Sequence, residues 1–161
     1  MNTKQLWNAL SLNPVTNKYF DGIYSSDTLN EIREKPSLII CNTDPSDKPG
    51  EHWVLFFFSE NSVDFFDSLG RDIKYYGSVF LHFIANFVDN YEQSLQRLQP
   101  IDSDLCGQYC LYYAFAKCNG LSMDEIIYSM PNNEYLVNFV NKLFYICPNY
   151  ECSLLQCCNF C

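Results

Sequence analysis

The fold of this chain is decided by one stretch, Cys106 to Ala116, which reads CGQYCLYYAFA. Apolar residues lie almost all the way round it at helical spacing, which is typical of a helix buried on every side. We therefore expect a central helix from Cys106 to Asn119. Gly120 is its expected C-terminal cap, because glycine readily adopts the left-handed conformation that ends a helix.

Cys106 falls in the first turn of this helix, just after Ser103 or Asp104 as the expected N-terminal cap. Unpaired backbone N–H groups and the positive end of the helix dipole meet there, and that setting lowers the pKa of a thiol. Gly107 leaves room for a substrate backbone to approach. Gln99, seven residues upstream of Cys106, offers a side-chain amide that can donate to an oxyanion together with the backbone N–H groups.

Two apolar segments upstream predict a pair of antiparallel strands. His52 to Phe58 (HWVLFFF) is almost continuously apolar, as expected of a central strand covered on both faces. Val63 to Asp67 returns as the second strand after a turn at 59–62. If the two ends of that turn oppose each other, His52 and Asp67 are diagonal neighbours on one face, within side-chain reach.

A thiolate nucleophile needs a base and a group that orients the base, and His52 and Asp67 are the expected pair. The other histidine, His82, lies in an apolar helical stretch, where a satisfied, partly buried histidine is the expectation. Asp64 is the alternative orienter, but the same register places it on the opposite face. Asp67 has a second reading as the cap of a turn before Gly70.

Helices that bracket a few apolar strands predict an α+β domain with a small central mixed or antiparallel sheet. The other expected strands are Ser37–Asn42 and Glu92–Gln99. The other expected helices are Thr3–Leu12, Tyr75–Asn90, Ser122–Tyr128 and one from Asn132 or Asn133 to about Ile146.

Composition narrows the class of protein. With 161 residues, 48% of them hydrophobic, the chain fits one domain with a substantial core. It has no apolar run as long as a membrane span and no secretory h-region, so we expect an intracellular, reducing compartment. A net charge of −9 without a Lys/Arg cluster argues against nucleic acid as a direct partner and favours encounter with basic peptides.

The nine cysteines are an odd number, which argues against a secreted disulfide framework. Cys41, Cys110 and Cys118 lie in apolar stretches and are expected in the core. A tail at 147–161 holds five more, Cys147, Cys152, Cys157, Cys158 and Cys161. Zinc on Cys152, Cys157, Cys158 and Cys161 is one reading of this tail, since Cys158 and Cys161 have ligand-like spacing. A flexible, reduced tail or one that packs on a partner is the reading we favour.

The motifs above, with two further ones, resemble the adenovirus-type cysteine endopeptidases, relatives of the SUMO-deconjugating proteases. The resemblance rests on Phe20-x-Gly22-Ile23-Tyr24, Ile40-Cys41-Asn42-Thr43, Gly50-Glu51-His52-Trp53, Phe66-Asp67-Ser68-Leu69-Gly70 and Gln99-x6-Cys106-Gly107. It covers roughly Tyr19 to Gly120 and keeps the chain order His, acid, Gln, Cys. The pattern is most like that of proteases from adenovirus-like DNA viruses and virus-like transposons.

The resemblance implies a cysteine-protease domain over 1–146, with 147–161 as a Cys-rich tail, and a catalytic set of His52, Asp67, Gln99 and Cys106. It further implies endoproteolysis of virion precursor proteins such as capsid or core proteins, in the host cytoplasm or nucleus or inside the virion. No cofactor is expected. Adenovirus enzymes are basic and are stimulated by DNA. This chain is acidic, so DNA is not expected as its cofactor. An activating peptide stays open as a further partner.

Two other functions stay open. The same chemistry would serve an isopeptidase that acts on ubiquitin or a ubiquitin-like modifier. A catalytically silent interaction module would keep the fold alone, although the joint presence of His52, Asp67, Gln99 and Cys106 argues against it.

Overall fold

The computed structural model describes residues 1–29 and 31–144. Their helices are α1 (Thr3–Leu12), α2 (Val79–Ala85), α3 (Cys106–Cys118), α4 (Met123–Ser129) and α5 (Asn133–Leu143), with 3-10 helices at Thr16–Lys18 and Ile73–Tyr76. The strands are β1 (Phe20–Ser25), β2 (Ser37–Asn42), β3 (Trp53–Phe58), β4 (Ser62–Phe66) and β5 (Asn90–Gln93). This is an α+β fold, as the sequence predicts.

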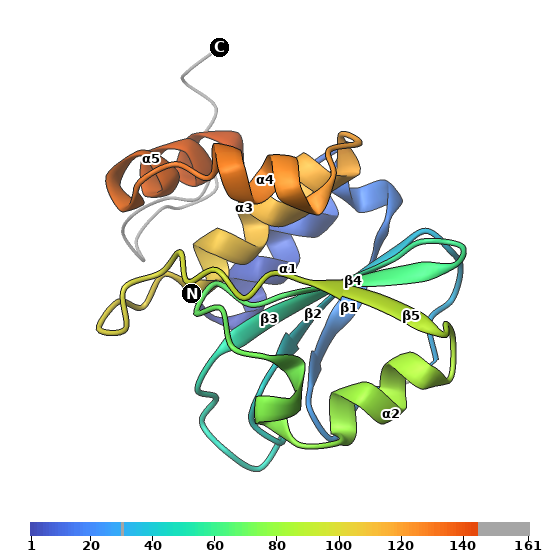
Figure 1. Cartoon of the computed structure of the whole chain (residues 1–161). Coiled ribbons are helices and arrows are strands. Elements are labelled where there is room, and N and C mark those ends of the chain that lie inside the picture. The colour runs from blue at the N-terminus through green and yellow to red at the C-terminus, as the bar shows by residue number, and fades with distance from the viewer. Residues whose placement is uncertain (30, 145–161) are drawn as a thin grey trace.

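The strands form one open mixed sheet in the order β1-β2-β3-β4-β5 (Figure 1). Pairing is antiparallel at the centre, between β2 and β3 and between β3 and β4. The two outer pairs, β1 with β2 and β4 with β5, are parallel. The sheet is therefore antiparallel in the middle and parallel at both edges.

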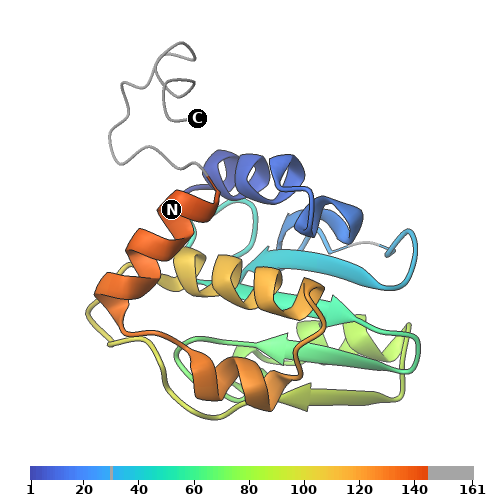
Figure 2. The same ribbon diagram turned by 90° about the horizontal axis from the view of Figure 1, so that it is seen from above.

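Helices cover both faces of the sheet (Figures 1 and 2). One face packs on α1, α3 and α5 through alternate strand residues such as Leu55 and Phe57. The other face packs on α2 through the residues between them, such as Phe56 and Phe58. Every residue of β3 is buried. This explains the unbroken apolar run of β3, because a strand covered on both faces has no solvent side.

The hairpin register predicted from the turn is confirmed. Ser59 N–H donates to the carbonyl of Ser62 across the turn at 2.8 Å. The ladder then pairs Phe58 with Val63 and continues to Leu55 opposite Phe66. The same register brings the start of β3 and the end of β4 to the same end of these two neighbouring strands.

Two predicted elements are wrong between β4 and α3. A single helix over Tyr75–Asn90 is replaced by the 3-10 helix and the short α2, because Gly77 has a φ of 77° that interrupts the helix. The predicted strand at Glu92–Gln99 is shorter and earlier, since β5 ends at Gln93. Residues 94–105 form a loop instead.

The central helix is confirmed as α3, and Gly120 follows it with a φ of 92°. The predicted N-terminal cap is wrong: Leu105 holds that position and no side chain caps the helix. Ser103 instead turns its hydroxyl to the carbonyl of Pro100. α1 has the predicted bounds, and α4 and α5 begin after Ser122 and Asn132, whose side chains cap them.

The predicted Cys-rich tail at 147–161 lies outside the described residues, as does the expected end of the last helix near Ile146. The division at residue 146 therefore stays a prediction. Within the described ranges, no helix combines the length and the apolar character that crossing a bilayer requires.

Candidate active site

A cavity of about 710 Å³ opens where α3 begins, and Cys106, His52 and Gln99 all line it. Its other walls come from the N-terminal residues Met1 to Thr3 and from the loop between β2 and β3. The fold therefore brings the predicted nucleophile, base and amide donor to one hollow, although they come from three separate parts of the chain.

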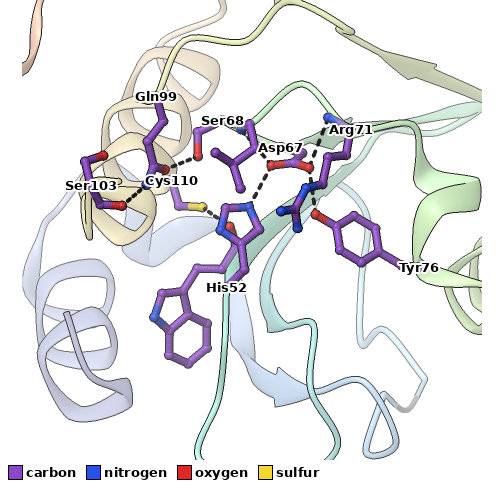
Figure 3. A network of polar contacts seen from close by, with 10 residues as sticks. His52, Asp67, Ser68, Arg71, Tyr76, Gln99, Ser103 and Cys110 are labelled. Atoms are coloured by element: carbon purple, nitrogen blue, oxygen red, sulfur yellow. Dashed lines mark hydrogen bonds and ion pairs between the residues drawn. The ribbon is translucent and has the colours of Figure 1, made fainter. Parts of the chain in front are cut away.

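His52 and Asp67 lie at strand ends, His52 just before β3 and Asp67 just after β4. His52 Nε2 is 2.6 Å from Asp67 Oδ1, and both side chains are buried (Figure 3). Adjacent antiparallel strands bring the start of one beside the end of the next, which is why residues fifteen positions apart meet here. The predicted pairing is present in the structure.

The side chain of Cys106 lines the same cavity and lies close enough to the imidazole of His52 for each to shift the pKa of the other. Since Nε2 is bonded to Asp67, Nδ1 is the ring nitrogen left for the thiol. Burial opposes the imidazolium, but the hydrogen bond to Asp67 and the nearby Cys106 raise the pKa of His52 to about 9. Burial likewise opposes the thiolate, yet the nearby His52 lowers the pKa of Cys106 below its ordinary value. The pair therefore favours a thiolate beside an imidazolium.

The carboxylate of Asp67 receives four donors. Oδ1 accepts from His52 and, at 2.8 Å, from the backbone N–H of Leu69. Oδ2 accepts from the Tyr76 hydroxyl at 2.7 Å and from the backbone N–H of Arg71 at 3.2 Å. Burial would raise the pKa of Asp67, but the bonds from His52, Tyr76 and Leu69 lower it. The alternative role of Asp67 as a turn cap is thus present beside its contact with His52.

Gln99 is buried and held at both ends of its amide (Figure 3). Oε1 accepts from the Ser68 hydroxyl at 2.7 Å, and Nε2 donates to the carbonyl of Ser103. An amide nitrogen carries two hydrogens, so one N–H remains for another acceptor. Gln99 lines the cavity with Cys106, in keeping with the predicted donor position.

The turn after β4 connects the two halves of the site. The carbonyl of Ser68 accepts from the backbone N–H groups of both Leu98 and Gln99 at 2.9 Å. Gly70 has a φ of 65°, and a Cβ there would lie 2.7 Å from backbone atoms of residues 95–97. Glycine is required because the loop that carries Gln99 packs directly on this turn.

Gly107 has a different neighbour from the one the sequence suggests. A Cβ built on it would lie 2.9 Å from Cβ of Met1, so the N-terminal residue occupies the space beside it. The Trp53 indole N–H donates to the Met1 carbonyl at 3.0 Å, which holds that residue in place. The expected room for substrate backbone at Gly107 is thus taken up on this side by Met1.

The alternative site residues lie elsewhere. Asp64 is on the α3 face of the sheet, where it accepts from Tyr113 and pairs with Lys117. His82 is on α2 and is exposed, so the expectation that it is partly buried is wrong. Cys41 and Cys110 are fully buried, and burial raises the pKa of both thiols.

Two residues that hold the site together, Ser68 and Tyr76, are not among the predicted site residues. Ser68 orients Gln99 and Tyr76 contacts Asp67. Ser68 stands inside the motif Phe66-Asp67-Ser68-Leu69-Gly70, so its position next to Asp67 was an available signal. Tyr76 offered none, because its contact depends on the 3-10 helix that replaces the predicted helix.

No group of three or more histidine, cysteine, aspartate or glutamate side chains in the described residues is arranged to hold a metal ion. The cysteines of the zinc alternative, Cys152, Cys157, Cys158 and Cys161, fall outside those residues.

No protein-family model matches the chain, and no curated protein does. Among solved structures it is similar to the crystal structure of the ASFV pS273R protease, with 16% identity and a TM-score of 0.58. The match covers 89% of this chain and 66% of that one. A crystal structure of the selenomethionine form of the same protease aligns over 73% of this chain and 48% of that one, with 23% identity and a TM-score of 0.46. The fold of this chain is therefore similar to that of the ASFV pS273R protease, at low sequence identity.

Proposed function

We propose that this protein is a cysteine endopeptidase with Cys106 as nucleophile, His52 as general base and acid, and Asp67 as the group that orients His52. The observation that carries the proposal is the buried hydrogen bond of His52 with Asp67, in the cavity that Cys106 lines from the start of α3. The structural similarity to a viral cysteine protease supports the same reading.

In the proposed reaction the Cys106 thiolate attacks the carbonyl carbon of the scissile peptide bond, and the carbonyl oxygen becomes an oxyanion. The free N–H of Gln99 and backbone N–H groups at the start of α3 donate to that oxyanion. The imidazolium of His52 gives its proton to the leaving amine, which breaks the C–N bond and leaves a thioester on Cys106. His52 then takes a proton from water, whose oxygen attacks the thioester and releases the acid product.

We further propose that the substrates are structural precursor proteins of a virus or virus-like element, cleaved inside the host cell or the assembling particle. This follows from the resemblance of the site motifs to virion-maturation proteases. The cavity is lined by residues of the loop before β3, such as Glu51, and by residues before α3, such as Gln99 and Ser103, and its volume of about 710 Å³ has room for a peptide segment.

The test is cleavage of a proteome-derived peptide library, with new N-termini identified by mass spectrometry. Cys106→Ala should abolish cleavage and keep the circular-dichroism spectrum, because the side chain is small. Cys110→Ala, one turn further along α3, is the matched control and should stay active. Loss of activity in Cys110→Ala with normal activity in Cys106→Ala would show that the nucleophile is misassigned.

Fluorogenic ubiquitin and SUMO substrates belong in the same experiment. Cleavage of these with no cleavage in the peptide library would replace the endopeptidase proposal with an isopeptidase. No cleavage of either kind, with no selective labelling of Cys106 by a thiol-reactive probe, would favour a silent interaction module.

A further inference from the structure

The hydroxyl of Tyr76 makes a contact that the proposed reaction does not use. It donates to Oδ2 of Asp67 at 2.7 Å, on the side of the carboxylate that faces away from His52 (Figure 3). Asp67 is almost fully buried, so water cannot readily replace a donor that is lost there. The contact therefore bears directly on how the carboxylate is held.

The ring of Tyr76 is fixed by its neighbours. It packs edge-on against Phe65 at 6.3 Å between ring centroids and lies 5.6 Å from Phe80. The guanidinium of Arg71 lies close to the Tyr76 side chain and 4.6 Å from the centre of the Tyr75 ring. The hydroxyl is thus held at one position, between an aromatic cluster and Arg71.

Burial and the neighbouring Asp67 raise the pKa of Tyr76 above its ordinary value, so its hydroxyl keeps its proton. Asp67 in turn is ionised, since its pKa is lowered. The proton in this contact therefore stays on the tyrosine, and the hydroxyl acts as a donor across the working pH range. The charged or titratable groups that face it are Asp67 and Arg71, with Tyr75 alongside.

The two oxygens of Asp67 are held with different strength. Oδ1 has His52 at 2.6 Å and the Leu69 N–H at 2.8 Å. Without the hydroxyl of Tyr76, Oδ2 would keep only the Arg71 N–H at 3.2 Å, a long bond. The carboxylate could then rotate about its Cβ–Cγ bond and take Oδ1 out of line with His52.

We propose that Tyr76 is a positioning residue of this site: its hydroxyl holds the Asp67 carboxylate so that Oδ1 faces His52, and it thereby promotes the thiolate of Cys106. The inference rests on the proposed function, because Asp67 matters in this way only if His52 serves Cys106. Tyr76 itself acts through Asp67 and is not assigned any contact with substrate.

The experiment compares Tyr76→Phe with Tyr75→Phe. Tyr76→Phe keeps the ring and its aromatic contacts and removes only the hydroxyl. Tyr75→Phe is the matched control, since its ring is exposed and it makes its contact with Arg71 through the ring face. The readouts are kcat, KM and the pH dependence of Cys106 alkylation by iodoacetamide, followed on the Cys106 peptide by mass spectrometry so that other cysteines do not contribute.

We expect Tyr76→Phe to lower kcat about tenfold with KM unchanged, since one hydrogen bond is worth roughly 1–1.5 kcal/mol. The apparent pKa of the Cys106 thiol should rise, because a misaligned Asp67 stabilises the imidazolium of His52 less. Tyr75→Phe should match the wild type in both readouts. Tyr76→Phe with wild-type kcat and a wild-type alkylation profile would overturn the inference.

A double substitution tests the route of the effect. If Tyr76 acts through Asp67, Tyr76→Phe should cost nothing further in an Asp67→Asn background. A second tenfold loss in that background would mean that Tyr76 acts by another route, and the inference would be wrong.

The alkylation profile also separates this inference from the proposed function, because it needs no substrate. A protein that cleaves no peptide but whose Cys106 profile shifts in Tyr76→Phe would lose the endopeptidase proposal and support the positioning role. A protein that cleaves peptides and shows no shift would keep the endopeptidase proposal and lose the positioning role.

Discussion

At the scale of single residues, the reactivity of a cysteine here depends on its neighbour and not on burial alone. Burial raises the pKa of the Cys118 thiol to about 12, and it raises those of Cys41 and Cys110 as well. Cys106 is also mostly buried, but it alone of these four has an imidazole beside it, and its pKa is lowered. The imidazole of His52 therefore outweighs desolvation at Cys106, whereas desolvation keeps the pKa of the other three thiols raised.

The first residue-scale prediction concerns pH. kcat/KM should follow a bell-shaped profile, because the reactive form is the thiolate of Cys106 beside the imidazolium of His52. Since the pKa of Cys106 is lowered, the acid limb should lie below the ordinary thiol value of about 8.5. Since the pKa of His52 is raised to about 9, activity should be lost as the pH rises through that value. A basic limb near the ordinary histidine value of about 6.5 would contradict the contact with Asp67.

The second residue-scale prediction concerns Gln99. Gln99→Ala should lower kcat by roughly 10²–10³ with little change in KM, because an oxyanion donor acts mainly in the transition state. Ser68→Ala should give a smaller loss of kcat, since it frees Oε1 of Gln99 and leaves the bond to Ser103. Gln96→Ala, at an exposed position of the same loop, is the control. A Gln99→Ala enzyme with normal kcat and a raised KM would move Gln99 from chemistry to substrate recognition.

At the scale of elements, α3 is tied to the sheet by a buried polar group as well as by apolar packing. Asp64 of β4 accepts from the Tyr113 hydroxyl at 2.6 Å and lies 2.7 Å from Lys117 Nζ. The Tyr113 ring stacks on Phe66 with centroids 4.3 Å apart. These contacts hold the C-terminal half of α3 against β4. They therefore help to fix the position of the helix, and of Cys106 at its first residue, relative to the sheet.

The element-scale prediction concerns this ion pair. Lys117→Met should lower the free energy of unfolding by about 3–5 kcal/mol, because it leaves the Asp64 carboxylate buried without its counter-charge. Urea denaturation measures the change. Lys142→Met, at an exposed position in the last turn of α5, is the matched control and should change stability by less than about 0.5 kcal/mol. Equal denaturation midpoints for the two variants would mean that the Asp64–Lys117 pair contributes little.

At the scale of the whole molecule, the chain carries a net charge of −9, whereas the residues that line the cavity include both acidic and basic side chains. Glu51 and Asp104 contribute acidic groups to that lining, and Lys48 and Arg71 contribute basic ones. The long-range field that a peptide meets before it docks is therefore set mainly by the acidic surface and not by the cavity.

The whole-molecule prediction follows from that field. For peptides with the same cleaved sequence, lysine-rich flanks should give a higher kcat/KM than glutamate-rich flanks at low salt. The ratio should fall towards one as the salt rises, because the Debye length shrinks from ~30 Å at 0.01 M to ~3 Å at 1 M. Initial-rate assays of both peptides across this range of salt measure the ratio of their kcat/KM values. A ratio that is independent of salt would assign the preference to direct contacts in the cavity.

The buried strand, the hairpin register and the central helix could be predicted from local patterns in the sequence. The unbroken apolar run of β3 predicted a strand buried on both faces, and the short turn set the register that brings His52 to Asp67. The apolar character of α3 predicted its burial and placed Cys106 in its first turn. Each of these follows from the residues of one short segment and its immediate neighbours along the chain.

The contacts between segments far apart in the chain could not be predicted in this way, because they depend on how whole elements pack together. The approach of Met1 to Gly107, the bond from Ser68 to Gln99 and the hydroxyl of Tyr76 on Asp67 leave no periodic trace in the sequence. The predicted helix at Tyr75–Asn90 failed for a related reason, since an apolar run cannot show where Gly77 will take a positive φ. A repeat determines which face of an element is buried, whereas the packing of whole elements determines which side chains meet there.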